Sequence, residues 1–247
     1  MSSSGGETEI LCSTRALPVL IPSRHRQIES AGSERGLGRC AIALDGDDRR
    51  ARSACLARPG GTITGVGEVA AELSAKRLEV LKDTFPSLRK IAMLWNAADL
   101  GMTPRYRSAE TAARTLGFEI QALGVREPED FTAGFAAMVH DRPDAILMVT
   151  DALMALNRKR VFEFAAQQKL PAIYEYAFLV RDGGLMSYGP DMGEVYDRAA
   201  DLGDRILKGA RPADLPFEQP TRFRLVINKK TLETLGHNTG SDADESG

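Results

Sequence analysis

Three places in the sequence bring together side chains that could hold a small organic molecule. Each place directly follows a short apolar run, and the side chains are Trp95 with Asn96, Thr150 with Asp151, and Tyr174 with Tyr176. Aromatic rings can stack on the flat or apolar part of a ligand. An aspartate accepts hydrogen bonds from an ammonium group, and the first N–H groups of a helix can hold a carboxylate. These residue types therefore predict a binding site for a small charged or aromatic solute.

The same side chains have ordinary structural roles that stay open at this stage. Thr and Asp are common N-cap residues, so Thr150 and Asp151 are also explained by a helix that starts there. Aromatic residues at strand ends often close the end of a sheet, which is a second role for Trp95, Tyr174 and Tyr176.

The sequence shows no arrangement typical of a catalytic or metal centre. Its histidines, His25, His140 and His237, are far apart. The cysteines at positions 12, 40 and 55 have neither C-x-x-C spacing nor a histidine close by. Neither a G-x-S-x-G nucleophile turn nor a Walker phosphate loop occurs. We therefore expect no catalytic residues, no metal, no cofactor and no enzymatic activity.

From about residue 56 onward, apolar runs alternate with amphipathic stretches, which is typical of an α/β fold. Strands are predicted at 90–95, 118–125, 144–150, 171–176, 185–188 and 223–227. Helices are predicted at 68–84, 103–116, from 129, at 151–169, 191–208 and 229–235. The nearly all-apolar run 144–150 suits a strand covered on both faces, which favours a doubly wound, mainly parallel sheet of roughly five strands. In such a sheet the ligand site lies beyond the carboxyl ends of the strands, where the three polar groups fall.

The amino-terminal part has a different composition. The first 58 residues contain nine arginines and no lysine, whereas the whole chain of 247 residues has a formal charge of only −2. We expect residues 1–55 to be poorly structured and 237–247 to be a disordered tail. No export signal and no apolar run of membrane-spanning length is visible. The balanced charge gives no reason to expect a nucleic-acid partner.

A series of motifs resembles a known family. In chain order these motifs are Arg58 to Gly65 (RPGGTITG), Ser74 to Glu79 (SAKRLE), Ile91 to Asn96 (IAMLWN), Leu170 to Tyr174 (LPAIY), Gly183 to Asp191 (GGLMSYGPD) and Leu207 to Pro216 (LKGARPADLP). This series is similar to the bacterial ABC-transporter substrate-binding proteins that include the tryptophan and aromatic amino-acid receptors. The resemblance covers residues 56–236.

The resemblance implies a type I periplasmic binding protein, in which two α/β lobes close on a small solute and present it to permease subunits. By this analogy 60–65 and 185–190 are crossings between lobes. The expected organisation is 1–55 outside the family, 56–190 a ligand-binding lobe, 191–220 part of the other lobe, and 221–236 a returning strand and last helix. Trp95, Asn96, Thr150 and Asp151 would then face an interlobe cleft, in a periplasmic protein.

Family members have a complete first lobe and an export signal before the crossing at 60–65. The sequence instead predicts one near-complete lobe and a remnant of the other, with a shifted reading frame or a wrong start upstream of Leu56 as our hypothesis. A cytoplasmic flavodoxin-like or nucleotide-binding enzyme is the alternative, because it uses the same alternating strands and helices.

Overall fold

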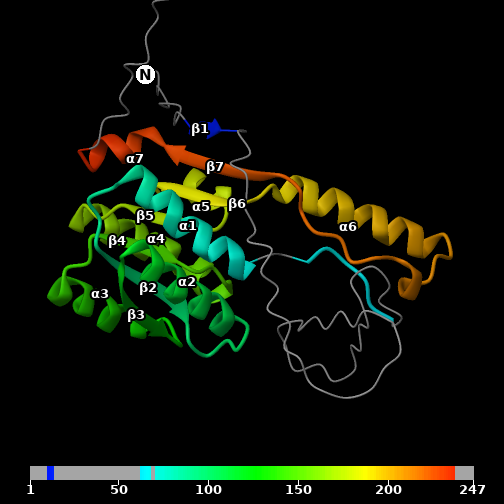
Figure 1. Ribbon diagram of the computed structural model, residues 1–247, viewed down its shortest axis with the longest axis horizontal. Coiled ribbons are helices and arrows are strands. Elements are labelled where there is room, and N and C mark those ends of the chain that lie inside the picture. Colours follow the sequence, from blue (N-terminus) through cyan, green and yellow to red (C-terminus); the bar gives the residue numbers. More distant parts are fainter. Residues whose placement is uncertain (1–9, 14–61, 68–69, 237–247) are drawn as a thin grey trace, which may run out of the picture. The chain divides into compact units, whose positions relative to one another are not determined.

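The computed structural model describes residues 10–13, 62–67 and 70–236, which fall into two units (Figure 1). Unit 1 is formed by Met1–Arg15, Val69–Pro190 and Phe223–Gly247. Unit 2 is formed by Ala16–Glu68 and Asp191–Arg222. The chain thus leaves unit 1 after Pro190, where the sequence predicts a crossing, and returns at Phe223. Most of the segment 1–55 and the tail 237–247 lie outside the described residues, so their predicted disorder stays a prediction.

Unit 1 contains a seven-stranded sheet with the order β1-β7-β6-β5-β4-β2-β3. The strands are β1 Ile10–Ser13, β2 Lys90–Asn96, β3 Glu119–Val125, β4 Ala145–Met148, β5 Ala172–Tyr174, β6 Met186–Pro190 and β7 Phe223–Asn228. Strands β2, β3, β4, β5 and β6 are parallel to one another, and β7 is antiparallel to both of its neighbours, β1 and β6. The predicted mainly parallel α/β sheet is therefore confirmed.

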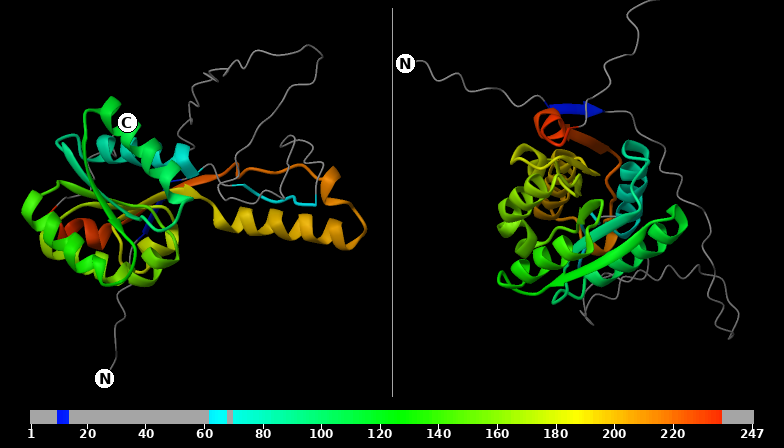
Figure 2. Two further views of the ribbon diagram at one scale, coloured as in Figure 1. Left: turned by 90° about the horizontal axis from the view of Figure 1, so that it is seen from below. Right: turned by 90° about the vertical axis from the view of Figure 1, so that its left-hand side faces the viewer.

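Helices cover both faces of this sheet (Figure 2). The helices of unit 1 are α1 Ala70–Thr84, α2 Met102–Leu116, α3 Asp130–Asp141, α4 Ala152–Gln168, α5 Ala177–Arg181 and α7 Lys229–Thr234. The apolar sides of α1 and α2 share one core cluster with the sheet, and those of α3, α4 and α5 share the other. This is the doubly wound arrangement that the alternating pattern predicts.

The strands alternate between these two clusters. In β2, Ile91 and Met93 pack with α1 and α2, whereas Ala92 and Leu94 pack with the helices of the opposite face. All four side chains are fully buried. A strand with two covered faces needs apolar residues at consecutive positions, which explains why this sequence lacks polar alternation.

Two elements of unit 1 were not predicted. Strand β1 lies within the segment 1–55, where we expected little structure, and it pairs with β7 from Ile10–Asn228 to Ser13–Leu225. Helix α5 has only five residues, Ala177–Arg181, and is too short to show a helical period in the sequence. It lies between β5 and the turn at Gly183, and its first residue directly follows the predicted strand 171–176.

Unit 2 contains α6 Met192–Leu207 and the 3-10 helix Pro212–Asp214. The carboxylate of Glu194 joins the first turn of α6 to the returning connector, because it accepts hydrogen bonds from Thr221 Oγ1 at 2.5 Å and from the Arg222 N–H at 2.9 Å. Arg198 Nε, one turn along α6, lies 3.2 Å from the same carboxylate. These donors lower the pKa of Glu194 to about 2, with the Thr221 hydroxyl as the largest cause.

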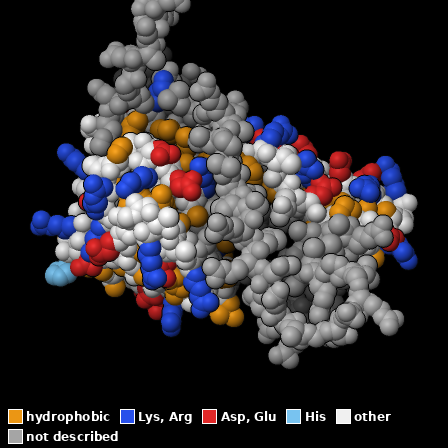
Figure 3. All heavy atoms as spheres, in the orientation of Figure 1, with side chains coloured by type: hydrophobic (Ala, Val, Ile, Leu, Met, Phe, Trp, Pro, Cys, Tyr) orange, Lys and Arg blue, Asp and Glu red, His pale blue; other side chains and the backbone are white. Residues whose placement is uncertain are grey.

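Apolar residues at helical spacing form a stripe along α6, and this stripe is buried only in part. Val195 and Leu202 are buried, but Ala199 and Ile206 are exposed. Basic and acidic side chains are interspersed over the face of the molecule in Figure 3.

Candidate functional site

The carboxyl ends of β2, β4 and β5 lie side by side. We call this end of the three strands the carboxyl edge. Leu94 of β2 pairs with Met148 of β4, and Leu147 of β4 pairs with Ile173 of β5. This register brings the residues that follow each strand to the same edge. All of them belong to unit 1, so the geometry of this edge is set by a single sheet and the helices packed on it.

Asn96 and Asp151 are in direct contact at this edge. Asn96 Nδ2 donates to Asp151 Oδ2 at 2.5 Å, and the other carboxylate oxygen, Oδ1, accepts from the Met154 N–H at 2.9 Å. Asp151 is therefore the N-cap of α4, which is the structural role left open by the sequence. The side chain stays partly exposed, so its negative charge is also available to a cationic group at this edge.

Thr150 and Trp95 each have a buried polar side-chain atom that forms no hydrogen bond with any described residue. Among the described residues, Thr150 Oγ1 and Trp95 Nε1 are two of three buried side-chain polar atoms that form no hydrogen bond. The third is Gln121 Oε1 on β3. A buried donor or acceptor without a partner costs about 1–3 kcal/mol. Thr150 follows β4 and Trp95 lies near the end of β2, so both atoms belong to neighbouring strands of the sheet.

The indole ring of Trp95 is held in place by an aromatic neighbour. It stacks on Tyr106 of α2, with a distance of 5.0 Å between the ring centroids and an angle of 16° between the planes. The Tyr106 hydroxyl donates to Glu110 Oε1 at 3.3 Å, one turn along α2. Burial, followed by the nearby Glu110 carboxylate, raises the pKa of Tyr106, so its phenol stays neutral at ordinary pH.

Tyr174 and Tyr176 lie in different surroundings. Tyr174 is 1% exposed and packs edge-to-face against Phe162 of α4, so it belongs to the core rather than to the rim where we expected it. Its burial raises the pKa of the phenol well above the usual value. Tyr176, which precedes α5, is partly exposed and stacks on Phe178 at 5.9 Å between centroids. Only Tyr176 of this pair stays in our candidate site.

The end of β5 explains the difference: Tyr174 is the last residue of the strand, whereas Tyr176 lies beyond it as the residue before α5. Ala172 and Tyr174 point to the face covered by α4 and α5, whereas Ile173 packs in the cluster of α1 and α2. Glu175 follows on the side of Ile173. We expected both tyrosines at the rim because they follow the apolar run that ends at Ile173, but the strand continues through Tyr174.

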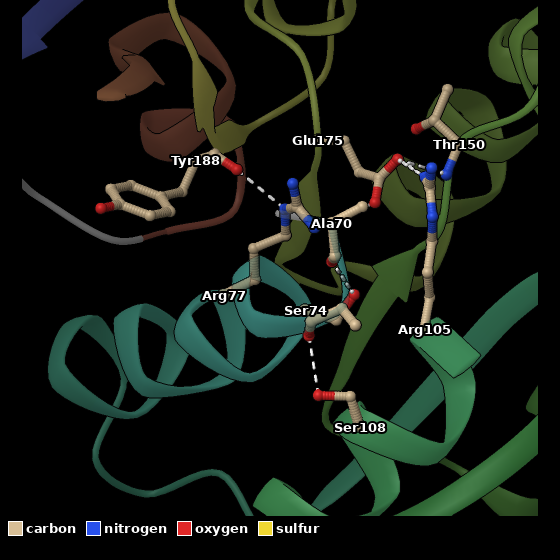
Figure 4. Close-up of polar contacts among 9 residues, drawn as sticks. Ala70, Ser74, Arg77, Arg105, Ser108, Thr150, Glu175 and Tyr188 are labelled. Carbon is tan, nitrogen blue, oxygen red and sulfur yellow. Dashed lines mark hydrogen bonds and ion pairs between the residues drawn. The ribbon is translucent and has the colours of Figure 1, made fainter. Parts of the chain in front are cut away.

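Glu175 is the centre of a buried charge cluster that we did not predict (Figure 4). Its side chain is 1% exposed; Oε1 accepts from Arg77 of α1 at 2.9 Å, and Oε2 accepts from Arg105 of α2 at 3.1 Å. Oε2 also accepts from the Thr150 N–H at 3.1 Å. The sequence signal was Arg77 itself, which lies between Leu73 and Leu81 on the buried stripe of α1.

Within the part of the chain that the structure describes, no group of three His, Cys, Asp or Glu side chains is placed to hold a metal ion. No helix in the same part is long and apolar enough to cross a membrane. The site therefore rests on its hydrogen-bonding groups, its charges and its aromatic rings.

The chain is similar to several known proteins. It is 25% identical over 181 residues to a tyrosine-binding protein of Clostridioides difficile, a match that covers 73% of this chain and 51% of that protein. The chain thus spans about half the length of this curated relative.

Two solved structures share the fold. One is an ABC domain from Streptococcus pneumoniae in complex with L-Trp, with 24% identity, a TM-score of 0.66 and coverage of 74% of this chain and 62% of that chain. The other is a conserved domain protein from Vibrio cholerae, with 23% identity, a TM-score of 0.68 and coverage of 74% and 61%.

The family model for the ABC transporter substrate binding protein matches residues 54–241, which include every residue of the candidate site. Its start at residue 54 agrees with the change of composition near Leu56. The chain therefore belongs to the ABC transporter substrate binding protein family.

Proposed function

We propose that this chain is the solute-binding component of an ABC importer and that it binds a small amino-acid-like solute at the carboxyl edge of β2, β4 and β5. The proposal is carried by two buried atoms that have no partner among the described residues, Thr150 Oγ1 and Trp95 Nε1, near the ends of neighbouring strands, with the partly exposed Asp151 directly after Thr150. A bound solute with hydrogen-bonding groups offsets the cost of leaving these atoms unpaired.

The chemistry of the edge suits an amino acid. The carboxylate of Asp151 attracts an ammonium group, and the first N–H groups of α4 favour a negative group such as a carboxylate. The rings of Trp95 and Tyr176 supply apolar surface for a side chain. Two relatives support this ligand class by their names, since one is a tyrosine-binding protein and the other was solved with L-Trp.

Delivery to permease subunits and a periplasmic location follow from the family by analogy. In the interlobe cleft that the resemblance implies, the edge of unit 1 would be one wall. No cofactor and no catalytic step enter this proposal, which treats the chain as a binding protein. The alternative of a flavodoxin-like or nucleotide-binding enzyme has no support from the family match.

Isothermal titration calorimetry of the full chain tests the ligand class. The probes are L-tyrosine, L-tryptophan, L-phenylalanine and L-leucine, with D-tyrosine as the matched control for stereospecific recognition. We expect saturable heat with at least one L-amino acid and weaker binding of the D-enantiomer. Absence of heat with all four L-amino acids would remove this ligand class.

A further inference from the structure

We propose that Glu175 is a positioning residue for the carboxyl edge of β2, β4 and β5. It acts by holding the turn between β4 and α4 in place. The inference rests on the proposed function, because the turn carries Thr150 and Asp151. Glu175 itself is buried and is not assigned a contact with the solute. Its role is exerted through the Thr150 N–H, which donates to Glu175 Oε2 at 3.1 Å.

The carboxylate of Glu175 joins three separate elements, and Arg77 links it to a fourth. Arg77 of α1 and Arg105 of α2 donate to opposite oxygens of the carboxylate, and the Thr150 N–H reaches it from the end of β4. Arg77 Nε also donates to the backbone oxygen of Tyr188 on β6, at 2.8 Å. Figure 4 shows the carboxylate of Glu175 between the two guanidinium groups. Hydrogen bonds between ionised groups are shorter and stronger than neutral ones, so this cluster is a rigid support.

The turn that Glu175 holds carries two side chains of the proposed binding site. Thr150 carries the hydroxyl without a partner, and the next residue, Asp151, caps α4 and receives Asn96 Nδ2. A shift of the Thr150 backbone would move both side chains together. A binding site kept in place by buried hydrogen bonds behind it loses less entropy when the ligand binds.

Backbone packing leaves Glu175 little freedom of its own. A Cβ atom at Gly189 of β6 would lie 2.0 Å from the carbonyl oxygen of Glu175. Glycine at this position therefore allows β6 to approach the backbone of Glu175 closely. The arginines hold the side chain of Glu175, and β6 lies close against its backbone.

Hydrogen exchange of the ligand-free full chain tests the positioning role directly. In Glu175→Gln one carboxylate oxygen becomes an amide donor, so at least one of its three donors loses its acceptor. We expect amides in 149–154 to exchange at least about tenfold faster, the change that corresponds to loss of one charge-assisted hydrogen bond. Unchanged exchange in this segment would overturn the proposal.

Asp144→Asn is the matched control, because it also changes a carboxylate into an amide. Asp144 precedes β4, whereas Thr150 follows the other end of that strand. Asp144 Oδ2 accepts from the N–H groups of Arg89 and Lys90, at 2.7 and 2.8 Å. Its exchange effect is expected near those two residues and not at 149–154.

Ligand affinity provides the second readout. With L-tyrosine and L-tryptophan as probes, Glu175→Gln should raise Kd at least about tenfold, whereas Asp144→Asn should leave Kd unchanged. Faster exchange with an unchanged Kd would overturn the role in binding. If the wild-type chain binds neither probe, the proposed function fails for this ligand class, and the exchange rates still decide whether Glu175 orders the turn.

Arg105 offers a milder variant if Glu175→Gln does not fold. Its side chain is 17% exposed, so a substitution there disturbs the core less. Arg105→Lys keeps a positive charge beside the carboxylate and should retain most of the affinity that Arg105→Ala loses. Equal Kd values for the two variants would contradict a role for this ion pair in positioning the edge.

Discussion

At the scale of single residues, Thr150 carries a buried hydroxyl that our proposal assigns to the solute. Its side chain is 6% exposed and its hydroxyl has no partner among the described residues, although its N–H is bound to Glu175. Valine has nearly the same shape as threonine and no hydroxyl. A site that needed only packing would be served better by valine at this position.

Thr150→Val is therefore expected to separate stability from binding. Removal of the unpartnered hydroxyl should raise the free energy of unfolding by up to about 1 kcal/mol, whereas solute affinity should fall. Denaturant unfolding and calorimetry measure the two effects. Thr234→Val is the control: Thr234 is exposed on α7, and its hydroxyl donates to the Lys230 oxygen at 2.8 Å. A Thr150→Val variant that is less stable than wild type would contradict this account.

Asp151 has two roles that a pair of substitutions can distinguish. Asp151→Asn keeps the N-cap bond from the Met154 N–H, loses the bond from Asn96 Nδ2, and removes the negative charge offered to an ammonium group. Asp151→Ala also removes the cap and should cost about 1 kcal/mol of stability. The account predicts weaker solute binding in both variants. Full affinity in Asp151→Asn would show that the charge does not contact the solute.

At the scale of elements, the strands and long helices could be predicted from the sequence, and the details of the site could not. Helix α2 has a Gly at its end and β4 is a continuous apolar run, so local signals were sufficient. The contact between Glu175 and the two arginines joins residues separated by 98 and 70 positions, and no local pattern reports it. The burial of Tyr174 depended on where a strand of only three residues ends, and sequence patterns place such ends poorly.

Two glycines predict opposite effects of the same substitution. Gly189→Ala on β6 would place a Cβ 2.0 Å from the backbone oxygen of Glu175, so the strands must separate, and we expect a loss of about 1–3 kcal/mol. Gly203→Ala in α6 meets nothing within 4 Å and should stabilise the helix by about 0.5–1 kcal/mol. Chemical denaturation of both variants measures the contrast. A neutral Gly189→Ala would contradict the close approach of β5 and β6.

The Glu194 carboxylate should make the stability of unit 2 depend on acid. Its pKa is about 2 in the folded protein, lowered from 4.5. The stabilisation is therefore present above about pH 4.5 and is lost as the pH falls toward 2. Glu194→Gln lacks this contribution, so the stability difference between wild type and variant should shrink over that pH range in thermal unfolding. A constant difference would contradict the assignment.

At the scale of the whole molecule, the proposed site lies within unit 1, and the chain spans 51% of the tyrosine-binding relative. The predicted type I fold and the family are confirmed. The division into lobes and the hypothesis of a shifted reading frame before Leu56 stay predictions. Because Trp95, Thr150 and Asp151 belong to the same sheet edge, unit 1 supplies the contacts on which our proposal depends.

The fluorescence of Trp95 tests the central claim most directly. Trp95 is the sole tryptophan of the chain, so a change in its emission reports on the proposed edge and on no other place. Titration of the full chain with L-tyrosine, with excitation of the indole alone, should give a saturable change that is weakened in Thr150→Val and retained in Thr234→Val. Calorimetric binding of L-tyrosine without any change in Trp95 emission would contradict the account, because the solute would then bind elsewhere.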